Sequence, residues 1–315
     1  MDGYAGQQQA LQNMSSSKVA LSIDVEDWFH GPHITGSDFS FYPDVESFMK
    51  TWDKPYDHIT RPTALIIALL KEYNIRCTFF IVADVLEYYP GLVESIIDAG
   101  HEIGCHSLHH KMSLHTKTKK AFISKDEFEQ DTGKSKEKLE SVYGKNIIGY
   151  RAPGAYIGDW MFESLIKLGF KYDSSVTANS LYNKTDFNTS KISSVPYWIV
   201  KNNSKLLEIP WPYFKIGPVR FPTGGGPFLR LFPSWYSIKG IRESLKRGDS
   251  VYYWHPYDVN EQSFPELASK NKRRPFFFKK SSKNGEKKMR QIIESFSGKW
   301  ACCEDIYKKN LTTQS

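Results

Sequence analysis

Short apolar runs of strand length alternate with longer stretches that have the apolar spacing of helices. The short runs are 18–25, 76–82, 101–106, 206–211 and 250–256, and the helical patterns between them include 60–74, 90–100, 124–142, 159–169 and 234–248. Repeated alternation of this kind predicts an α/β fold with a parallel sheet, either open or closed as a barrel.

Several helix ends carry boundary signals. Thr60 is expected to cap the helix that follows it, with Pro62 in the first turn, and Gly100 is a natural C-terminal stop. Ser124 and Glu127 form a capping-box pattern ahead of the next helix.

The rhythm of strands and helices predicts one domain from residue 18 to residue 310. The stretch 176–233 interrupts the rhythm with proline, glycine and aromatic residues, and we interpret it as an irregular elaboration beside the site. Residues 1–17 lack the basic head and apolar stretch of a secretory signal, so they are expected to form a flexible leader.

The positive charge is concentrated in one segment. The chain has a formal net charge of +7, yet residues 269–290 alone hold ten Lys or Arg and one Glu. A nucleic-acid-binding protein more often spreads basic residues over a whole face, so we expect no nucleic acid partner. The segment is interpreted either as a solvated surface or as a contact with an anionic membrane, into which Phe276, Phe277 and Phe278 could insert.

Composition also bears on location. No run of 18 apolar residues exists, which argues against a membrane-spanning helix. The four cysteines show no C-x-x-C spacing and fit a reducing compartment. We therefore expect a cytoplasmic protein, with a peripheral position at the inner membrane face as the sharper hypothesis.

Acidic residues crowd the end of the first predicted strand. In "LSIDVEDWFH", Asp24, Glu26 and Asp27 lie within four positions. Carboxylates placed there repel one another and resist burial unless a cation or a proton lies among them.

A histidine cluster follows a later strand. In "HSLHH", His106 and His110 are four residues apart, which places both on one side of a turn. Two imidazoles and a carboxylate form a three-ligand site typical of a catalytic zinc or a similar divalent ion. Both clusters follow predicted parallel strands, and parallel α/β folds gather their active sites at that edge.

Three more polar residues stand at strand ends. Arg151 lies in "GYRAPGAY", where an arginine beside carboxylates would hold one of them ionised and aimed. His255 follows the aromatic run "YYW" and could donate a proton, and Asp173 ends the run in "KYDSS".

The order of "IDVED", "HSLHH", "RAPGA", "YDSS" and "YWHP" resembles the polysaccharide deacetylase family, also called the NodB-homology or carbohydrate esterase 4 family. The resemblance covers roughly residues 18–260, and the first motif is similar to that of the subgroup found with bacterial surface-polysaccharide synthesis. It implies a distorted, incomplete (β/α) barrel and hydrolysis of the N-acetyl group of an N-acetylhexosamine, in a polysaccharide or its lipid-linked precursor. It also implies one divalent metal ion, with zinc expected and cobalt or nickel as alternatives.

The resemblance assigns roles to the catalytic residues. Asp24 is similar to the general base that takes a proton from the attacking water, and Arg151 to the arginine that fixes this base. His255 resembles the general acid that protonates the leaving amine, and Asp173 the residue that orients this histidine. These roles suit amide hydrolysis, which needs a Lewis acid, a base for water and an acid for nitrogen.

The metal ligands implied by the resemblance are His106, His110 and one carboxylate. The family motif commonly has two adjacent aspartates, whereas here Val25 and Glu26 separate Asp24 from Asp27. Residues two apart face the same side of a strand. We therefore expect Glu26 to be the carboxylate ligand and keep Asp27 as the alternative.

Two further positions are expected to contact substrate. The backbone N–H near Gly154 resembles the donor that stabilises the oxyanion, although Gly154-Ala155 departs from the Tyr-Gly of many members. Trp254 stands where leucine is common, so the acetyl pocket is expected to have a different shape.

Two other functions remain open. One is an amidohydrolase of this family acting on a small cyclic amide or ureide. The other is a catalytically inactive carbohydrate-binding module, against which the intact set of acidic, histidine and arginine residues argues.

Overall fold

The computed structural model describes residues 13–261, 264 and 284–312. Most of the predicted leader and positions 269–283 of the basic segment lie outside the described residues. Within them, nine strands form one sheet, in the order β10-β1-β2-β3-β4-β5-β7-β6, with β11 beside β1. Every neighbouring pair in it is parallel except β6 and β7. The strands of this sheet are β1 (Val19–Val25), β2 (Thr78–Ile81), β3 (Glu102–Cys105), β4 (Gly149–Tyr150), β5 (Tyr172–Asp173), β6 (Tyr197–Lys201), β7 (Ser204–Glu208), β10 (Ser250–Trp254) and β11 (Trp300–Ala301).

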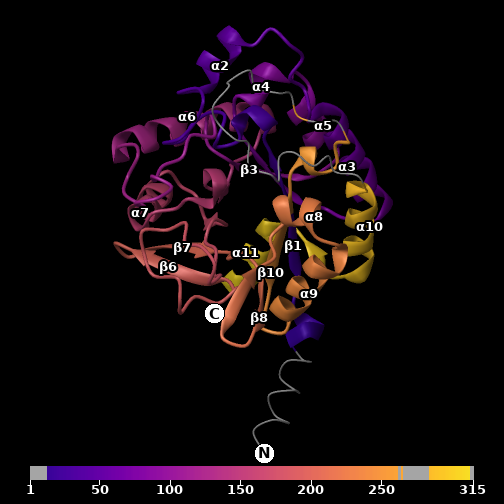
Figure 1. The fold of residues 1–315 in the computed structure, drawn as a ribbon. Helices are drawn as coiled ribbons and strands as arrows, with labels where there is room; N and C mark the ends of the chain where they lie inside the picture. Colours follow the sequence, from indigo (N-terminus) through magenta and orange to yellow (C-terminus); the bar gives the residue numbers. More distant parts are fainter. Residues whose placement is uncertain (1–12, 262–263, 265–283, 313–315) are drawn as a thin grey trace, which may run out of the picture.

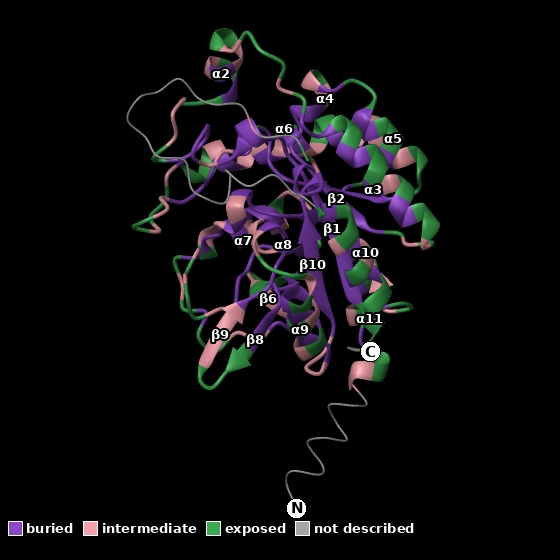
Figure 2. Cartoon of the chain, turned by 45° about the vertical axis from the view of Figure 1, so that its right-hand side comes forward, coloured by how far each residue is buried: buried purple, intermediate pink, exposed green. Residues whose placement is uncertain are grey.

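Helices flank the curled sheet, and the hairpin of β6 and β7 lies at its edge (Figure 1). These helices are α2 (Val45–Thr51), α3 (Thr60–Glu72), α4 (Val85–Tyr88), α5 (Leu92–Asp98), α6 (Lys125–Tyr143), α7 (Asp159–Lys167), α8 (Pro227–Leu231), α9 (Ser234–Leu245), α10 (Gly285–Ser295) and α11 (Cys303–Thr312). The exposed residues of these helices lie on the outside, whereas β1, β2 and β10 are buried along their whole length (Figure 2). The expectation of a distorted, incomplete (β/α) barrel is confirmed.

The alternation of side chains along β1 separates the two faces of the sheet. Val19, Leu21, Ile23 and Val25 belong to the large apolar core under the helices. The residues between them point to the opposite, concave face, because side chains alternate along a strand. This face also carries Phe80, Tyr172 and Tyr253, together with Cys303 and Ile306 of α11, which packs inside the curl of the sheet. The concave face therefore has an apolar floor and, where the strands end, polar residues.

The stretch 176–233 contains ordered elements. β6 and β7 pair as a hairpin at one edge of the main sheet, and β8 (Tyr213–Ile216) pairs with β9 (Val219–Pro222) in a separate two-stranded sheet. The run "FPTGGGPF" then passes directly over β10. A Cβ on Gly225 would lie 1.3 Å from the carbonyl oxygen of Tyr253, so only glycine allows this approach.

One helix start agrees with its sequence signal and one does not. The Ser124 hydroxyl accepts a hydrogen bond from Glu127 N at 3.1 Å, as the capping-box pattern predicted. The expectation that Thr60 caps α3 is wrong by one residue, because the helix begins at Thr60 and Ile59 precedes it. The free N–H groups there are bound by Asp57, whose Oδ1 accepts from Ile59 N and Thr60 N.

Candidate active site

Three predicted metal ligands converge at the ends of β1 and β3, the two strands on either side of β2. Glu26 follows β1 and His106 follows β3, and the loop after His106 carries His110 back over the site. One donor atom of each lies within 4.8 Å of the other two. The Nε2 atom of His106 is 3.6 Å from Glu26 Oε2, and the Nε2 atom of His110 contacts the same oxygen.

The hydrogen bonds of the two histidines determine what their inner nitrogens can do. The Nδ1 atom of His106 lies 2.7 Å from the carbonyl oxygen of Arg151, and that of His110 lies 2.7 Å from the carbonyl oxygen of His30. A carbonyl only accepts, so each neutral ring carries its hydrogen on Nδ1 and presents a lone pair at Nε2. The Nε2 lone pairs of His106 and His110 then face the Oε2 atom of Glu26 without a proton between them, and all three residues are buried. This donor set fits a divalent cation.

Asp27 does not join this group. Its Oδ1 atom accepts from Trp28 N at 2.6 Å, and its Oδ2 atom accepts from His58 N at 2.9 Å and from the Tyr89 hydroxyl at 2.6 Å. The residue is the N-cap of the short 3₁₀ turn Trp28–His30. Among the described residues, the structure therefore brings Glu26, and not Asp27, together with the two histidines. Burial raises the pKa of Asp27 to about 6, against the effect of these hydrogen bonds.

Asp24 and Arg151 form a buried ion pair beside the ligand group. Arg151 Nη1 lies 2.6 Å from Asp24 Oδ1 and also donates to the Ser22 hydroxyl at 2.8 Å. Arg151 Nε donates to the carbonyl oxygen of Ser174, and Arg151 Nη2 donates to the Ser174 hydroxyl. The guanidinium carbon of Arg151 lies 4.2 Å from the ring centroid of Phe80. Arg151 is thus held on all sides, and it fixes the direction of the Asp24 carboxylate.

His255 lies near the carboxylate oxygen of Glu26 that the two histidine ligands do not contact, with its Nε2 atom 3.4 Å from Glu26 Oε1. Its Nδ1 atom is 3.0 Å from Asp258 Oδ2, and the same carboxylate accepts from His255 N at 2.9 Å. Burial would lower the pKa of His255, but the charges of Asp258 and Glu26 raise it above its usual value. Asp258 is itself held by Arg230, whose Nε lies 3.0 Å from Oδ1.

The prediction that Asp173 orients His255 is wrong. Asp173 accepts from the hydroxyl of Ser175 at 2.7 Å and neighbours Glu208 on the adjacent strand. The sequence analysis did not assign Asp258 as the partner of His255, although the spacing of His255 and Asp258 in "HPYD" indicates such a contact. A carboxylate three residues after a histidine can bond the backbone and the ring of that histidine in one turn.

The neighbouring histidines control the ionisation of Glu26, the carboxylate in the centre. Burial alone would raise the pKa of Glu26, but His110, His106 and His255 hold it well below its usual value. The Tyr257 hydroxyl donates to Glu26 Oε1 at 2.6 Å. Glu26 is therefore ionised and has one oxygen turned to Tyr257 and the other to the histidine pair.

These groups open into one cavity of about 220 Å³. Gly154 lines it, as predicted, in a turn with a positive φ of 56°. A Cβ at this position would lie 2.7 Å from Met112 Cε, which also lines the cavity. The expectation that Trp254 shapes the pocket is wrong. Trp254 points to the helix-covered core on the other face of β10, and Tyr253, one residue earlier, lines the cavity.

A buried network supports His110 from behind. His30, whose carbonyl binds His110, has its Nε2 atom 3.0 Å from Asp84 Oδ1. The other oxygen of Asp84 lies 3.2 Å from Nδ1 of His109. His30 therefore contacts the ligand residue His110, and His109 contacts Asp84; neither belongs to the ligand group.

A second group of potential ligands lies at the other end of the sheet, formed by Glu102, Cys302 and Glu304. Arg76 occupies it, with Nη1 3.0 Å from Cys302 Sγ and Nη2 2.8 Å from Glu304 Oε2. The Thr78 hydroxyl donates to Glu102 at 2.5 Å. Because a cation of the protein already serves these acceptors, we assign no metal there.

Residues 43–172 match the family model for polysaccharide deacetylase. This match assigns residues 43–172 to the polysaccharide deacetylase family. Residues 174–308 match a second model, a domain of unknown function (DUF3473). Both matched segments contribute strands to the main sheet.

Curated relatives agree with this assignment. The chain is 29% identical to the peptidoglycan deacetylase of Helicobacter pylori over 168 residues, which cover 50% of this chain and 55% of that protein. It is 26% identical to a peptidoglycan-N-acetylglucosamine deacetylase of Bacillus cereus over 140 residues, covering 44% of this chain and 61% of that protein. The chain thus spans little more than half the length of these relatives.

A solved structure shares the fold of this chain. It is a protein of Mycobacterium smegmatis assigned to the polysaccharide deacetylases, with a TM-score of 0.62 and 19% identity over 94% of this chain and 90% of that chain. Among the described residues, none of the helices combines the length and the apolar character needed to cross a lipid bilayer.

Proposed function

We propose that this protein is a metal-dependent de-N-acetylase that hydrolyses the N-acetyl group of an N-acetylhexosamine in a bacterial polysaccharide or its lipid-linked precursor. One observation carries the proposal. The Glu26, His106 and His110 group lines a single cavity together with His255 and with Asp24, which Arg151 holds. The named activity of the two relatives, deacetylation of peptidoglycan, supports the same chemistry.

Glu26, His106 and His110 would hold the divalent ion. We propose zinc, since two histidines and a carboxylate suit it, with cobalt or nickel as alternatives. When bound, such an ion polarises the amide carbonyl and makes water more acidic.

Asp24 is placed to accept the proton of the attacking water. Its carboxylate is 3% exposed and lines the cavity, and Arg151 holds one of its oxygens at 2.6 Å. An ionised, aimed carboxylate at this position is the group that general base catalysis requires.

His255 is placed to protonate the leaving nitrogen. The hydrogen bond from Nδ1 to Asp258 directs Nε2 into the cavity, and the charge of Asp258 favours the protonated ring. A protonated histidine in the same cavity as the base can deliver its proton as the C–N bond breaks.

The cellular setting stays a prediction from the sequence. A role in bacterial surface-polysaccharide synthesis, a cytoplasmic location and contact of the basic segment 269–290 with an anionic membrane are proposed on motif similarity and composition. One catalytic domain over 18–310 is proposed on the same footing, and the shared sheet favours it.

Acetate release tests the function. The purified chain should release acetate from an N-acetylglucosamine tetramer or an N-acetylated lipid-linked sugar, lose this activity with a chelator and regain it with zinc. His106→Ala or His110→Ala should lose bound metal and turnover together. Turnover of a cyclic ureide without turnover of any glycan would favour the amidohydrolase, and bound glycan without any turnover would favour the inactive module.

A further inference from the structure

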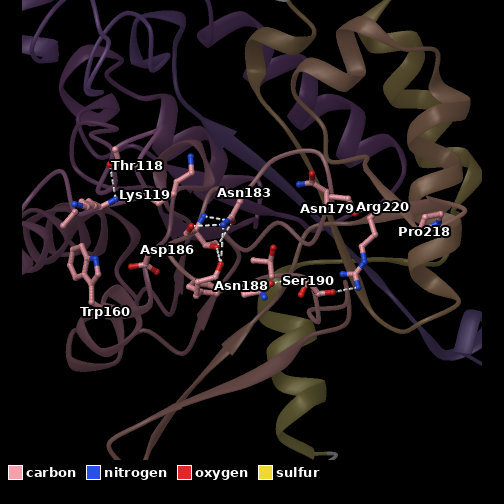
Figure 3. Close-up of a pocket in the computed structure, with 16 residues that line it drawn as sticks. Thr118, Lys119, Trp160, Asn179, Asn183, Asp186, Asn188, Ser190, Pro218 and Arg220 are labelled. Atoms are coloured by element: carbon pink, nitrogen blue, oxygen red, sulfur yellow. Dashed lines mark hydrogen bonds between the residues drawn. The ribbon is translucent and has the colours of Figure 1, made fainter.

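A polar groove of about 1070 Å³ lies next to the candidate active cavity. It is formed by the loop around Lys119 and by the segment from Asn179 to Ser190. Figure 3 shows Lys119 and Trp160 at one end of the groove, Asn183 in the middle and Arg220 at the other end. Amides, hydroxyls and an indole dominate the lining, and such groups suit a ligand rich in hydroxyl groups.

The groove and the cavity lie next to each other at Tyr156, since Tyr156 lines the cavity and Lys119, which lies over its ring, lines the groove. Two ammonium groups lie over this ring, Lys119 Nζ at 4.8 Å from the centroid and Lys184 Nζ at 5.5 Å. Lys184 stands between two groove residues, Asn183 and Thr185. We call Lys119 and Lys184 the lysine pair.

The lysine pair has carbonyl acceptors and no ion pair within the part of the chain that the structure describes. Lys119 Nζ donates to the carbonyl oxygen of Thr116, and Lys184 Nζ donates to that of Gly154 at 2.8 Å. Asp38, which attracts Lys119, already binds the hydroxyl of Thr116 at 2.9 Å. Each ammonium group can make three hydrogen bonds, so the pair retains donors for a ligand.

Electrostatics supports an anionic ligand. Burial, and then the nearby Lys119, lower the pKa of Lys184 to about 8, and burial also lowers the pKa of Lys119. Two partly desolvated cations beside one another are unfavourable until a negative charge lies between them.

We infer that the lysine pair binds the carboxylate of an acidic sugar adjacent to the N-acetylated sugar in the cavity, while the groove holds the continuing glycan. The inference rests on the proposed deacetylation and adds the substrate class, an acidic polysaccharide. It makes Lys119 and Lys184 specificity-determining residues, both absent from the sequence-based set.

Binding to two oligosaccharides of equal length tests the charge preference. The probes are a tetrasaccharide of alternating N-acetylglucosamine and glucuronic acid and the neutral N-acetylglucosamine tetramer. Titration calorimetry would use the Asp24→Asn chain, in which turnover is suppressed. The acidic probe should bind about tenfold more tightly at low salt, because a hydrogen bond to a charged group is stronger than a neutral one. The advantage should shrink at 1 M salt, where the Debye length falls to about 3 Å. Equal binding of the two probes overturns the inference.

Substitutions locate the preference. Lys119→Gln and Lys184→Gln should each reduce the ratio of the two affinities toward one, whereas Lys184→Arg, which keeps the charge, should preserve it. Lys117→Gln is the matched control, since Lys117 is exposed on the same loop and outside the groove. A ratio unchanged in both glutamine variants means that the pair only supports the turn at Gly154 and overturns the inference.

Two further arms separate the possible outcomes. If N-acetylglucosamine 1-phosphate binds through the lysine pair and the uronate tetrasaccharide does not, the site is for phosphate and the inference is overturned. Acetate release by the unmodified chain is measured in parallel on both tetrasaccharides. Release without an acidic preference refutes this inference alone, and a lysine-dependent preference without release from any glycan refutes the deacetylation alone.

Discussion

Replacing Asp258 by asparagine should slow turnover while leaving the metal site intact. Asp258 Oδ2 lies 3.0 Å from His255 Nδ1 and accepts from His255 N at 2.9 Å. Asparagine keeps the shape and one oxygen acceptor but removes the charge that favours the protonated ring. Among the described residues, Asp258 contacts His255 and Arg230, and it bonds to none of the ligand residues Glu26, His106 and His110.

The expected decrease in kcat follows from the hydrogen bond between His255 and Asp258, which becomes weaker in the asparagine variant. A hydrogen bond to a charged partner contributes about 1.5–3 kcal/mol and a neutral one about 0.5–1.5 kcal/mol, so roughly 1–1.5 kcal/mol is lost. If that loss falls on the transition state, kcat decreases about tenfold, with KM little changed. Arg230 also loses a charged partner 3.0 Å away. Removing one partner of a buried pair can cost about 3–5 kcal/mol, and the oxygen retained by asparagine should keep the loss below that range.

The assay combines steady-state acetate release, bound-metal analysis and urea unfolding on the same preparations. Asp173→Asn is the matched control, because Asp173 is an equally buried aspartate at a strand end that does not touch His255. The control should keep kcat close to that of the parent. If Asp258→Asn turns over at the parent rate, or if the Asp173 variant alone is slow, the assignment of Asp258 as the positioning residue is refuted.

Three other outcomes are expected. Glu26→Ala should deplete bound metal and Asp27→Asn should not; the reverse result would restore the alternative ligand. Asp24→Asn should keep its metal and lose about 10²- to 10⁴-fold in kcat, the usual contribution of a general base, and activity within a few-fold of the parent would exclude this role. Burial, and then Asp173, raise the pKa of Glu208 well above its usual value, so its neutral form stabilises the fold at low pH and this stability is lost as pH rises through the raised pKa. When urea unfolding is measured from pH 5 to pH 9, the free energy of unfolding of the parent chain should therefore fall by up to about 1.4 kcal/mol per pH unit, and Glu208→Gln should lack this fall. Parallel curves of unfolding free energy against pH for the two proteins would contradict this.

The sequence predicted the fold and the ligand group because both follow from local periodicity. Polar residues placed directly after apolar strands meet at one edge of a parallel sheet, and alternation along β1 puts Asp24 and Glu26 on the same side. The same alternation explains the error at Trp254, where a shift of one residue moves a side chain from the cavity to the core.

Other site features depend on contacts that no spacing reveals. Asp173 stands at a strand end as predicted, but the adjacent strand brings Glu208 beside it and not His255. Lys184 lies in the stretch 176–233, which has no clear helix or strand periodicity. Its position over the Tyr156 ring depends on the tertiary structure of that stretch. Positions of this kind require the tertiary structure.

The place of β1 in the sheet has a consequence for the order of assembly during synthesis. β1 is made first, yet it pairs with β10 and β11, which are made more than 200 residues later. Val19 N donates to the carbonyl oxygen of Lys299 at 2.9 Å, and both described chain ends lie at the same side of the molecule (Figure 1). Pairing at such sequence separation is slow and comes late in folding. β1 can pair with β2 early, but its other edge stays unpaired until β10 and β11 have been made. A circularly permuted chain in which β10 directly precedes β1 should therefore fold faster.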